Sequence, residues 1–186
     1  MSLRYRISVE DYLEEEKENS IRHEYVNGHV FAMAGASDRH NLIAGNVYAR
    51  LRDMVSAGPC QAFISDMKIM AEPGIFYYPD LVLASDPPDS DLHVLRQPIL
   101  IIEVSSPSTE RTDRFEKLPA YKRITGLQEC GLISEAQMLV EVHRRVSGDW
   151  QAEIVSRPED LVRFESVDSS LTLKDIYRNA GFEGGA

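Results

Sequence analysis

Cysteine is scarce in this chain, and long apolar runs are missing. The two cysteines, Cys60 and Cys130, have a spacing that fits neither a metal-ligand motif nor a disulfide framework. No apolar run approaches the ~20 residues that a membrane helix needs, and the stretch from Met1 to Arg6 has no apolar signal-peptide core. These absences exclude a disulfide-stapled scaffold and a helical membrane protein, and they predict a protein of the reducing cytoplasm.

Positive charge is also in short supply. The chain carries 20 Lys and Arg side chains against 30 Asp and Glu, which gives a net charge of −10. A protein that coats nucleic acid is expected to have a basic surface, so the composition excludes that class. It does not exclude an enzyme, because carboxylates that hold a metal make the metal-free chain more acidic. Residues 107–123 have five basic residues against three acidic ones. They could dock phosphate or simply form a solvated helix face.

The length and the order of elements predict one mixed α/β domain over residues 1–186, with a central mixed sheet flanked by helices. Ser8 and Ser37 can each cap a helix, and Asn27-Gly28 between two strand-like runs is a strong hairpin signal. Helices are expected from residue 9, over 38–57, over 109–124 with a kink at Pro119, and over 173–180. Strands are expected at 22–26, 29–33, 61–65, 67–71, 76–84, 99–104, 129–133, 139–145 and 151–155, and a loop at 86–90.

Two acidic residues stand in strongly apolar surroundings. Glu103 follows four consecutive aliphatic residues, 99–102, and Asp80 precedes the apolar run 81–84. A buried ionised carboxylate is normally paired with a cation or a metal ion. We therefore predict that Asp80, Glu103 and the backbone carbonyl of Val104 hold a metal at one rim of the sheet. The alternative is a buried ion pair with Lys117 or Arg114.

Pro79-Asp80, followed by 22 residues and then Glu103-Val104-Ser105, is similar to the PD-(D/E)xK nuclease motif. Related matches lie at 22–28, 33–37, 78–80, 103–109, 127–130 and 142–145, and in the spacing of Asp113, Lys117 and Tyr121. Together these stretches resemble the Uma2 family, also called DUF820, over about residues 8–177.

The resemblance implies a restriction-endonuclease-like fold, often as a homodimer, with Asp80 and Glu103 as metal ligands. This chain departs from the simple motif at one position, because the lysine expected two residues after Glu103 is Ser105. Lys117, on the following helix, is the natural substitute. Cys130 stands where the family more usually has an aromatic residue, which leaves the catalytic residues unaffected.

Five further residues are weaker candidates, and each has a structural alternative. Glu24 could be an extra ligand or a hairpin salt-bridge partner, and Asp66 could lie near Asp80 or be an exposed turn residue. Asp113 could orient Lys117 or form an ordinary pair four residues apart. Tyr121 is expected to serve packing more than chemistry. His40 could contact phosphate or metal, or be a partly exposed residue of a helix cap.

The sequence therefore predicts an endonuclease that hydrolyses phosphodiester bonds in nucleic acid, with DNA as the expected substrate. Mg²⁺ or Mn²⁺ would be the cofactor, since such an ion leaves positions open for water and phosphate. Lys117 would assist the attacking water. Two alternatives stay open. One is a catalytically inactive binding or assembly protein that retains the fold, and the other is a small-nucleotide phosphohydrolase, which suits the net charge better than long DNA does.

Overall fold

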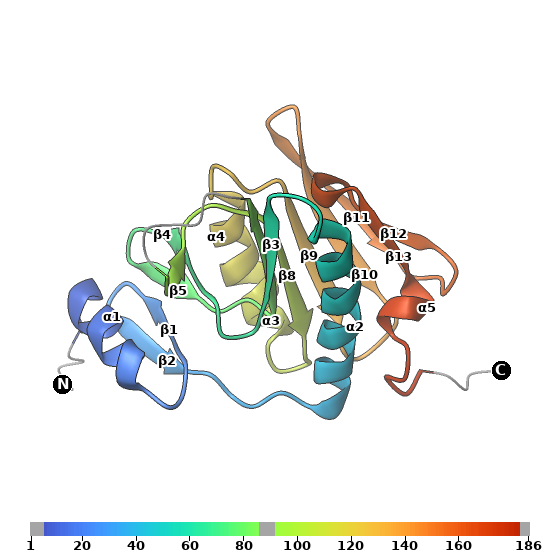
Figure 1. Ribbon diagram of the computed structural model, residues 1–186. Helices are drawn as coiled ribbons and strands as arrows, with labels where there is room; N and C mark the ends of the chain where they lie inside the picture. The colour runs from blue at the N-terminus through green and yellow to red at the C-terminus, as the bar shows by residue number, and fades with distance from the viewer. Residues whose placement is uncertain (1–5, 86–91, 183–186) are drawn as a thin grey trace.

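The computed structural model describes residues 6–85 and 92–182, so the expected loop at 86–90 lies outside the described residues. Its central element is a six-stranded mixed sheet of order β11-β10-β9-β8-β6-β3 (Figure 1). Strands β8 and β9 run parallel, and the other neighbours are antiparallel. The strands are β3 (Cys60–Ile64), β6 (Leu81–Ser85), β8 (Pro98–Ser105), β9 (Glu129–Ser134), β10 (Val140–Val146) and β11 (Asp149–Val155).

A second sheet of order β2-β1-β5-β4-β7 lies beside the first, next to the N-terminal helix (Figure 1). It contains β1 (His23–Val26), β2 (His29–Ala32), β4 (Lys68–Glu72), β5 (Ile75–Tyr77) and β7 (Val94–Leu95). A two-stranded ladder joins β12 (Leu161–Phe164) to β13 (Ser169–Thr172). Strands β7, β12 and β13 were not predicted from the sequence. The fold class is as predicted, a mixed α/β protein with a central mixed sheet flanked by helices.

The helices begin where capping predicted. Ser8 accepts a hydrogen bond from the Asp11 N–H at the start of α1 (Val9–Glu18), and Ser37 does the same for His40 at the start of α2 (Asp38–Val55). The other helical segments are α3 (Glu110–Thr112), the π turn η1 (Asp113–Lys117), α4 (Leu118–Lys122), the 3₁₀ turn η2 (Glu165–Val167) and α5 (Leu173–Ile176). The expected helix at 173–180 is thus shorter than predicted. In the part of the chain that the structure describes, no helix is long and apolar enough to cross a membrane.

Strand β8 is buried on both faces, as its unbroken apolar run predicted. Leu100, Ile102 and Val104 belong to the core beneath α2. Ile101 faces the opposite way, into the core that α4 covers together with Leu118. Successive side chains of a strand point to opposite faces, so Glu103 shares the face of Ile101 and lies under the helical segment 110–122.

The predicted strand 76–84 is wrong, because the chain changes sheets inside it. Residues up to Tyr77 pair in the five-stranded sheet as β5, and residues from Leu81 pair in the six-stranded sheet as β6. The step between them is Tyr78-Pro79-Asp80. Proline has no backbone N–H to donate to a ladder, so Pro79 favours a break at this point. Asp80 therefore stands at a junction between sheets rather than within a strand.

The hairpin around Asn27-Gly28 is confirmed. Asn27 has φ 49° and Gly28 has φ 93°, and two consecutive positive φ values are typical of a type I′ turn, for which Asn-Gly is the favoured pair. The turn fixes the register of β1 against β2, so that Glu24 lies directly opposite Phe31.

A buried carboxylate, Glu16, fastens α1 to β1 and to the step between the two sheets. It is 2% exposed, and it accepts hydrogen bonds from the His23 N–H at 2.8 Å and the Tyr78 hydroxyl at 3.0 Å. Burial alone would raise the pKa of Glu16, but these donors together lower it. A lowered pKa in the folded state stabilises the fold above the unfolded-state pKa and loses that contribution as the pH falls.

Replacing Glu16 by Ala is expected to cost about 3 kcal/mol at pH 7, because buried donors lose their acceptor. The difference from wild type should shrink as the pH falls below about 4.5, the ordinary glutamate pKa, and through the lowered folded-state value. Urea unfolding at pH 7 and pH 4 measures both effects. The exposed neighbour Glu15→Ala is the control, and an equal loss in both variants would contradict the prediction.

Candidate active site

Asp80 is held by two contacts from elements far apart in the sequence. Its Oδ2 accepts a hydrogen bond from the Val104 N–H at 2.7 Å, and its Oδ1 lies 2.8 Å from Nε2 of His40. The first contact ties the sheet junction to the end of β8, next to Glu103. The second contact joins Asp80 to the first turn of α2. The Asp80 hydrogen bond and the Asp80 charge outweigh burial and raise the pKa of His40.

The helical segment 110–122 presents Asp113, Lys117 and Tyr121 to Glu103. Residues four apart lie on one helix face, and all three are buried. The Leu118 N–H donates to the Asp113 carbonyl, five residues back, which widens this turn into a π helix. Pro119 was expected to kink or break the helix. The helix is not broken there: a π turn ends two residues before Pro119, and helical structure continues through Lys122.

The amine of Lys117 lies among three carboxylates. Its Nζ is 2.7 Å from Glu24 Oε1, 3.4 Å from Glu103 Oε1 and 3.6 Å from Asp113 Oδ1. Burial would lower the pKa of Lys117, but the three carboxylates outweigh it and raise the pKa above its ordinary value. Lys117 is therefore protonated at neutral pH. We call Glu24, Asp80, Glu103 and Asp113, with Lys117, the acidic cluster.

Glu103 is as deeply buried as Asp113, at 3% exposed. Burial raises the pKa of Glu103, the negative charges of Asp80 and Asp113 add to the rise, and the net result is a pKa of about 8. Lys117 and the Tyr121 hydroxyl act in the opposite direction, and the hydroxyl donates to Glu103 Oε1 at 2.5 Å. The positive charge around Glu103 is therefore too small to offset its burial and the charges of the neighbouring carboxylates.

The donor set fits a divalent cation. Four carboxylates meet here, against one amine and the imidazole of His40, so the cluster carries an excess of negative charge. Glu24 Oε1 is buried and has Lys117 Nζ as its ion-pair partner, at 2.7 Å. Carboxylate oxygens are the ligands that Mg²⁺ and Mn²⁺ prefer. A cation placed among them would balance the charge.

The site is not arranged as a ready-made metal cage. Across residues 6–85 and 92–182, no three His, Cys, Asp or Glu side chains are grouped so as to hold an ion. Oxygens of Glu103 and Asp80 are engaged by Lys117, Tyr121 and His40. A metal would therefore have to rearrange at least one of these contacts.

Four predicted supporting residues meet at this site, and one does not. Glu24, Asp113, Tyr121 and His40 each contact a member of the predicted trio Asp80, Glu103 and Lys117. The side chain of Asp66 is 77% exposed and lies 3.9 Å from Arg22. Asp66 is therefore an exposed turn residue, the structural alternative given for it. Tyr121 contributes its hydroxyl as well as its ring, which goes beyond the packing role expected of it.

The alternative of an ion pair with Arg114 is wrong, because the Arg114 guanidinium pairs with Glu141 at 2.5 Å. The ion pair of Glu103 with Lys117 is present, at 3.4 Å. Sequence reasoning missed Tyr77, whose ring lies 5.6 Å from Lys117 Nζ and packs edge-on against Tyr121. In the sequence, only its position three residues before Asp80 connected Tyr77 with the site.

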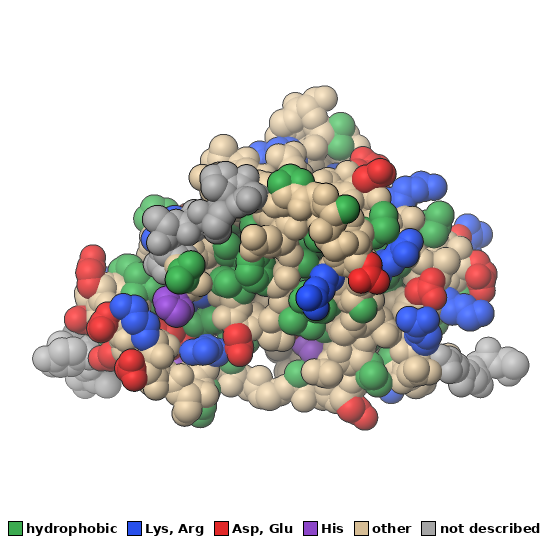
Figure 2. Space-filling model, viewed as in Figure 1, with side chains coloured by type: hydrophobic (Ala, Val, Ile, Leu, Met, Phe, Trp, Pro, Cys, Tyr) green, Lys and Arg blue, Asp and Glu red, His purple; other side chains and the backbone are tan. Residues whose placement is uncertain are grey.

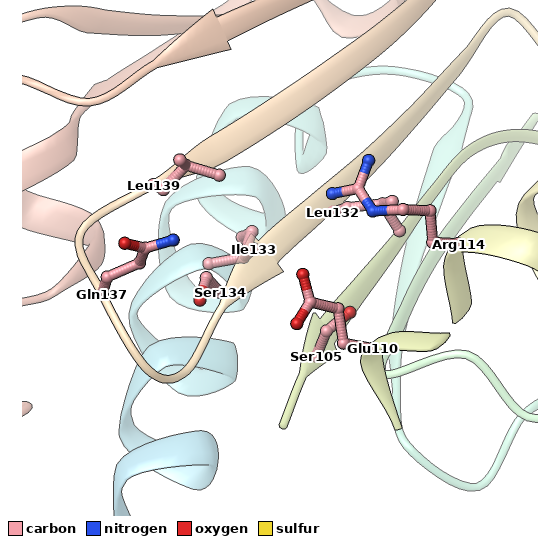
Figure 3. Close-up of a pocket in the computed structure, with 8 residues that line it drawn as sticks. All are labelled: Ser105, Glu110, Arg114, Leu132, Ile133, Ser134, Gln137 and Leu139. Atoms are coloured by element: carbon pink, nitrogen blue, oxygen red, sulfur yellow. The ribbon is translucent and has the colours of Figure 1, made fainter. Parts of the chain in front are cut away.

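Ser105 lines a shallow pocket beside the cluster, at the carboxyl ends of β8 and β9 (Figure 3). Ser105 stands where the simple motif has lysine, and it shares the sheet face of Glu103 because the two residues are two positions apart on the strand. Arg114 and Glu110 reach the pocket from the helical segment, and Gln137 reaches it from the loop after β9 (Figure 3). The small side chain at 105 thus leaves open space, while Lys117 supplies the amine from the helix.

Comparisons with known proteins show the family to which the chain is related. A family model for Uma2, described as "Putative restriction endonuclease", matches residues 9–174. An uncharacterized protein of Synechocystis is 30% identical over 180 residues, which cover 95% of this chain and 94% of that protein. A second uncharacterized Synechocystis protein is 31% identical over 149 residues, covering 78% and 84%.

A solved structure from Anabaena variabilis has the same fold. It is described as a "putative nuclease belonging to DUF820", and it superposes with a TM-score of 0.78 at 20% sequence identity. The match covers 92% of this chain and 97% of that one.

Proposed function

Because the chain belongs to the Uma2 family of restriction-endonuclease-like proteins, we propose that it is a metal-dependent endonuclease acting on nucleic acid, with DNA as the expected substrate. The observation that carries the proposal is the meeting of four buried or half-buried carboxylates with one protonated lysine, at the junction between two sheets. The family relationship supports a nuclease-like activity.

Asp80, Glu103 and the Val104 carbonyl would hold Mg²⁺ or Mn²⁺ in this proposal. When bound, the ion would supply an activated water and neutralise charge on the phosphate. The Val104 N–H and His40 keep the Asp80 carboxylate oriented. The Tyr121 hydroxyl fixes the position of Glu103 Oε1 by donating a hydrogen bond to it. Lys117 carries a fixed positive charge close to where charge develops on the phosphate.

Measurement of Mn²⁺ binding by calorimetry tests the site without a known substrate. The wild type is expected to bind saturably, and Asp80→Asn is expected to lose binding. Asp66→Asn is a matched control, since it makes the same chemical change on an exposed turn 14 residues earlier. Equal binding in all three proteins would place the metal elsewhere. No binding to the wild type, with or without DNA present, would contradict metal dependence.

Cleavage assays then separate the proposed enzyme from its alternatives. The wild type with Mn²⁺ or Mg²⁺ is expected to cut plasmid or oligonucleotide DNA, and Asp80→Asn is expected to lose this activity by about 100-fold or more. Hydrolysis of free nucleotides without cleavage of DNA would favour the phosphohydrolase. A protein that binds DNA equally well in both forms and cuts neither substrate would favour the inactive binding protein.

Two further expectations remain predictions. The resemblance implies a homodimer, which sedimentation velocity of the purified protein would test. The cytoplasmic location is expected from the cysteine content, and it would be tested by fractionating cells that express the chain.

A further inference from the structure

Phe31 is an exposed aromatic side chain beside the acidic cluster. It lies directly opposite Glu24 in the ladder between β1 and β2, and directly opposed residues point to the same face of a sheet with Cβ atoms about 5 Å apart. The Glu24 carboxylate reaches Lys117 at 2.7 Å. Phe31, in contrast, is 54% exposed. Its ring therefore stands at the rim of the site.

The neighbours of Phe31 extend this surface. Side chains two residues apart on a strand share a face, so His29 and Met33 lie on either side of Phe31. Met33 continues the ladder past the end of β2, since its N–H donates to the Arg22 carbonyl at 2.9 Å, and its side chain is 36% exposed. Residues 29–36 contain no Asp, Glu, Lys or Arg. This stretch is thus an uncharged platform with an aromatic ring at its centre.

Charge near the site does not favour binding through phosphates. The net charge is −10, and Lys117 is already surrounded by three carboxylates. On the face shown in Figure 2, the Lys and Arg side chains of the described residues are interspersed with acidic ones rather than aligned in a stripe. Stacking of a base on an aromatic ring needs no basic surface, because every base has a π face.

We propose that Phe31 is a stacking platform for an unpaired base, and that the substrate enters the site as single-stranded nucleic acid or as a locally opened duplex. This inference rests on the proposed nuclease function. Bases within a duplex are stacked on each other, so a ring on a strand stacks most readily on a base that has left its pair. The register of Phe31 against Glu24 then places the phosphates next to that base close to the acidic cluster.

Binding of a fluorescein-labelled oligo(dT) of about 15 nucleotides, in EDTA so that no cleavage occurs, tests the proposal. Phe31→Ala is expected to weaken binding about 5- to 150-fold, the range found for removing one stacking ring. Phe31→Tyr should retain the affinity. Phe115→Ala is the matched control, because Phe115 is 70% exposed on the π turn and is expected to leave the affinity unchanged. A duplex of the same length should bind more weakly than the single strand.

Three results would overturn the inference. The first is equal binding by Phe31→Ala and wild type, and the second is no binding of oligo(dT) by the wild type. The third is conversion of a dimer to a monomer by Phe31→Ala in sedimentation velocity, which would place Phe31 in a contact between two copies. The nuclease proposal fails separately, since unchanged cleavage by Asp80→Asn would refute it without altering metal-free binding. Retained Mn²⁺ binding by Phe31→Ala shows that the variant has kept its fold.

Discussion

Lys117→Met is expected to lower nucleic-acid cleavage by about 100-fold or more, while Mn²⁺ binds the variant more tightly than the wild type. The loss of cleavage follows from removing a fixed positive charge near the reacting phosphate, which typically costs about 10²–10³ in rate. The gain in metal affinity follows from the contacts of the amine. Glu24, Glu103 and Asp113 all lose their shared cation, so the carboxylates attract a divalent ion more strongly.

The stability of the Lys117→Met variant tests the contacts of the lysine independently of cleavage. Removing one partner of a buried ion pair typically costs about 3–5 kcal/mol, because the remaining charge is left unpaired. Metal-free Lys117→Met should therefore unfold at lower urea concentration than the wild type, and Mn²⁺ should recover much of the loss. Lys174→Met is the control, since that side chain is 71% exposed. Cleavage by Lys117→Met at the wild-type rate would refute the proposed role of the lysine.

Ile102→Ala is expected to destabilise the fold by about 2–5 kcal/mol, the usual cost of truncating a fully buried aliphatic side chain to alanine. Ile102 is 0% exposed in the core beneath α2, directly before Glu103 on β8. For a domain of this size the loss corresponds to about 5–15 °C in Tm. The β8 strand carries Glu103 and the Val104 N–H that holds Asp80, so its packing supports the site.

Thermal unfolding followed by circular dichroism measures this effect. Ile154→Ala is the matched control, because Ile154 is 64% exposed on the edge strand β11 and its truncation should stay within about 0.5 kcal/mol of wild type. Equal Tm values for Ile102→Ala and wild type would contradict the central position of β8 in the core.

The sequence by itself determined the elements whose causes are local. Ser8 and Ser37 cap their helices because their hydroxyls satisfy backbone donors of the first turn. Asn27-Gly28 forms its turn because both positions accept positive φ. The buried strand around Glu103 followed from an unbroken aliphatic run. Asp80 and Glu103 could also be chosen from the sequence, because acids in apolar surroundings need a partner, and the resemblance to the family pointed to Lys117.

Only the tertiary structure decided how these residues meet. The sequence showed a continuous strand at 76–84, whereas the paired sheets divide it at Pro79, and the division places Asp80 beside Val104. The roles of His40 and Glu24 depended on contacts across 40 and 93 residues of chain. Their local patterns suit a cap residue and a hairpin salt bridge equally well.

The position of the Lys117 amine shows most clearly what the sequence predicted and what the tertiary structure decided. Sequence reasoning noted that Ser105 stands where lysine was expected and that Lys117 could replace it. The π turn before Pro119, and the packing of that helical segment over β8, bring the Lys117 amine within 3.4 Å of Glu103. Spacing along the chain fixes which residues share a helix face. The distance of that face from a neighbouring strand is set by core packing, which links residues far apart in the sequence.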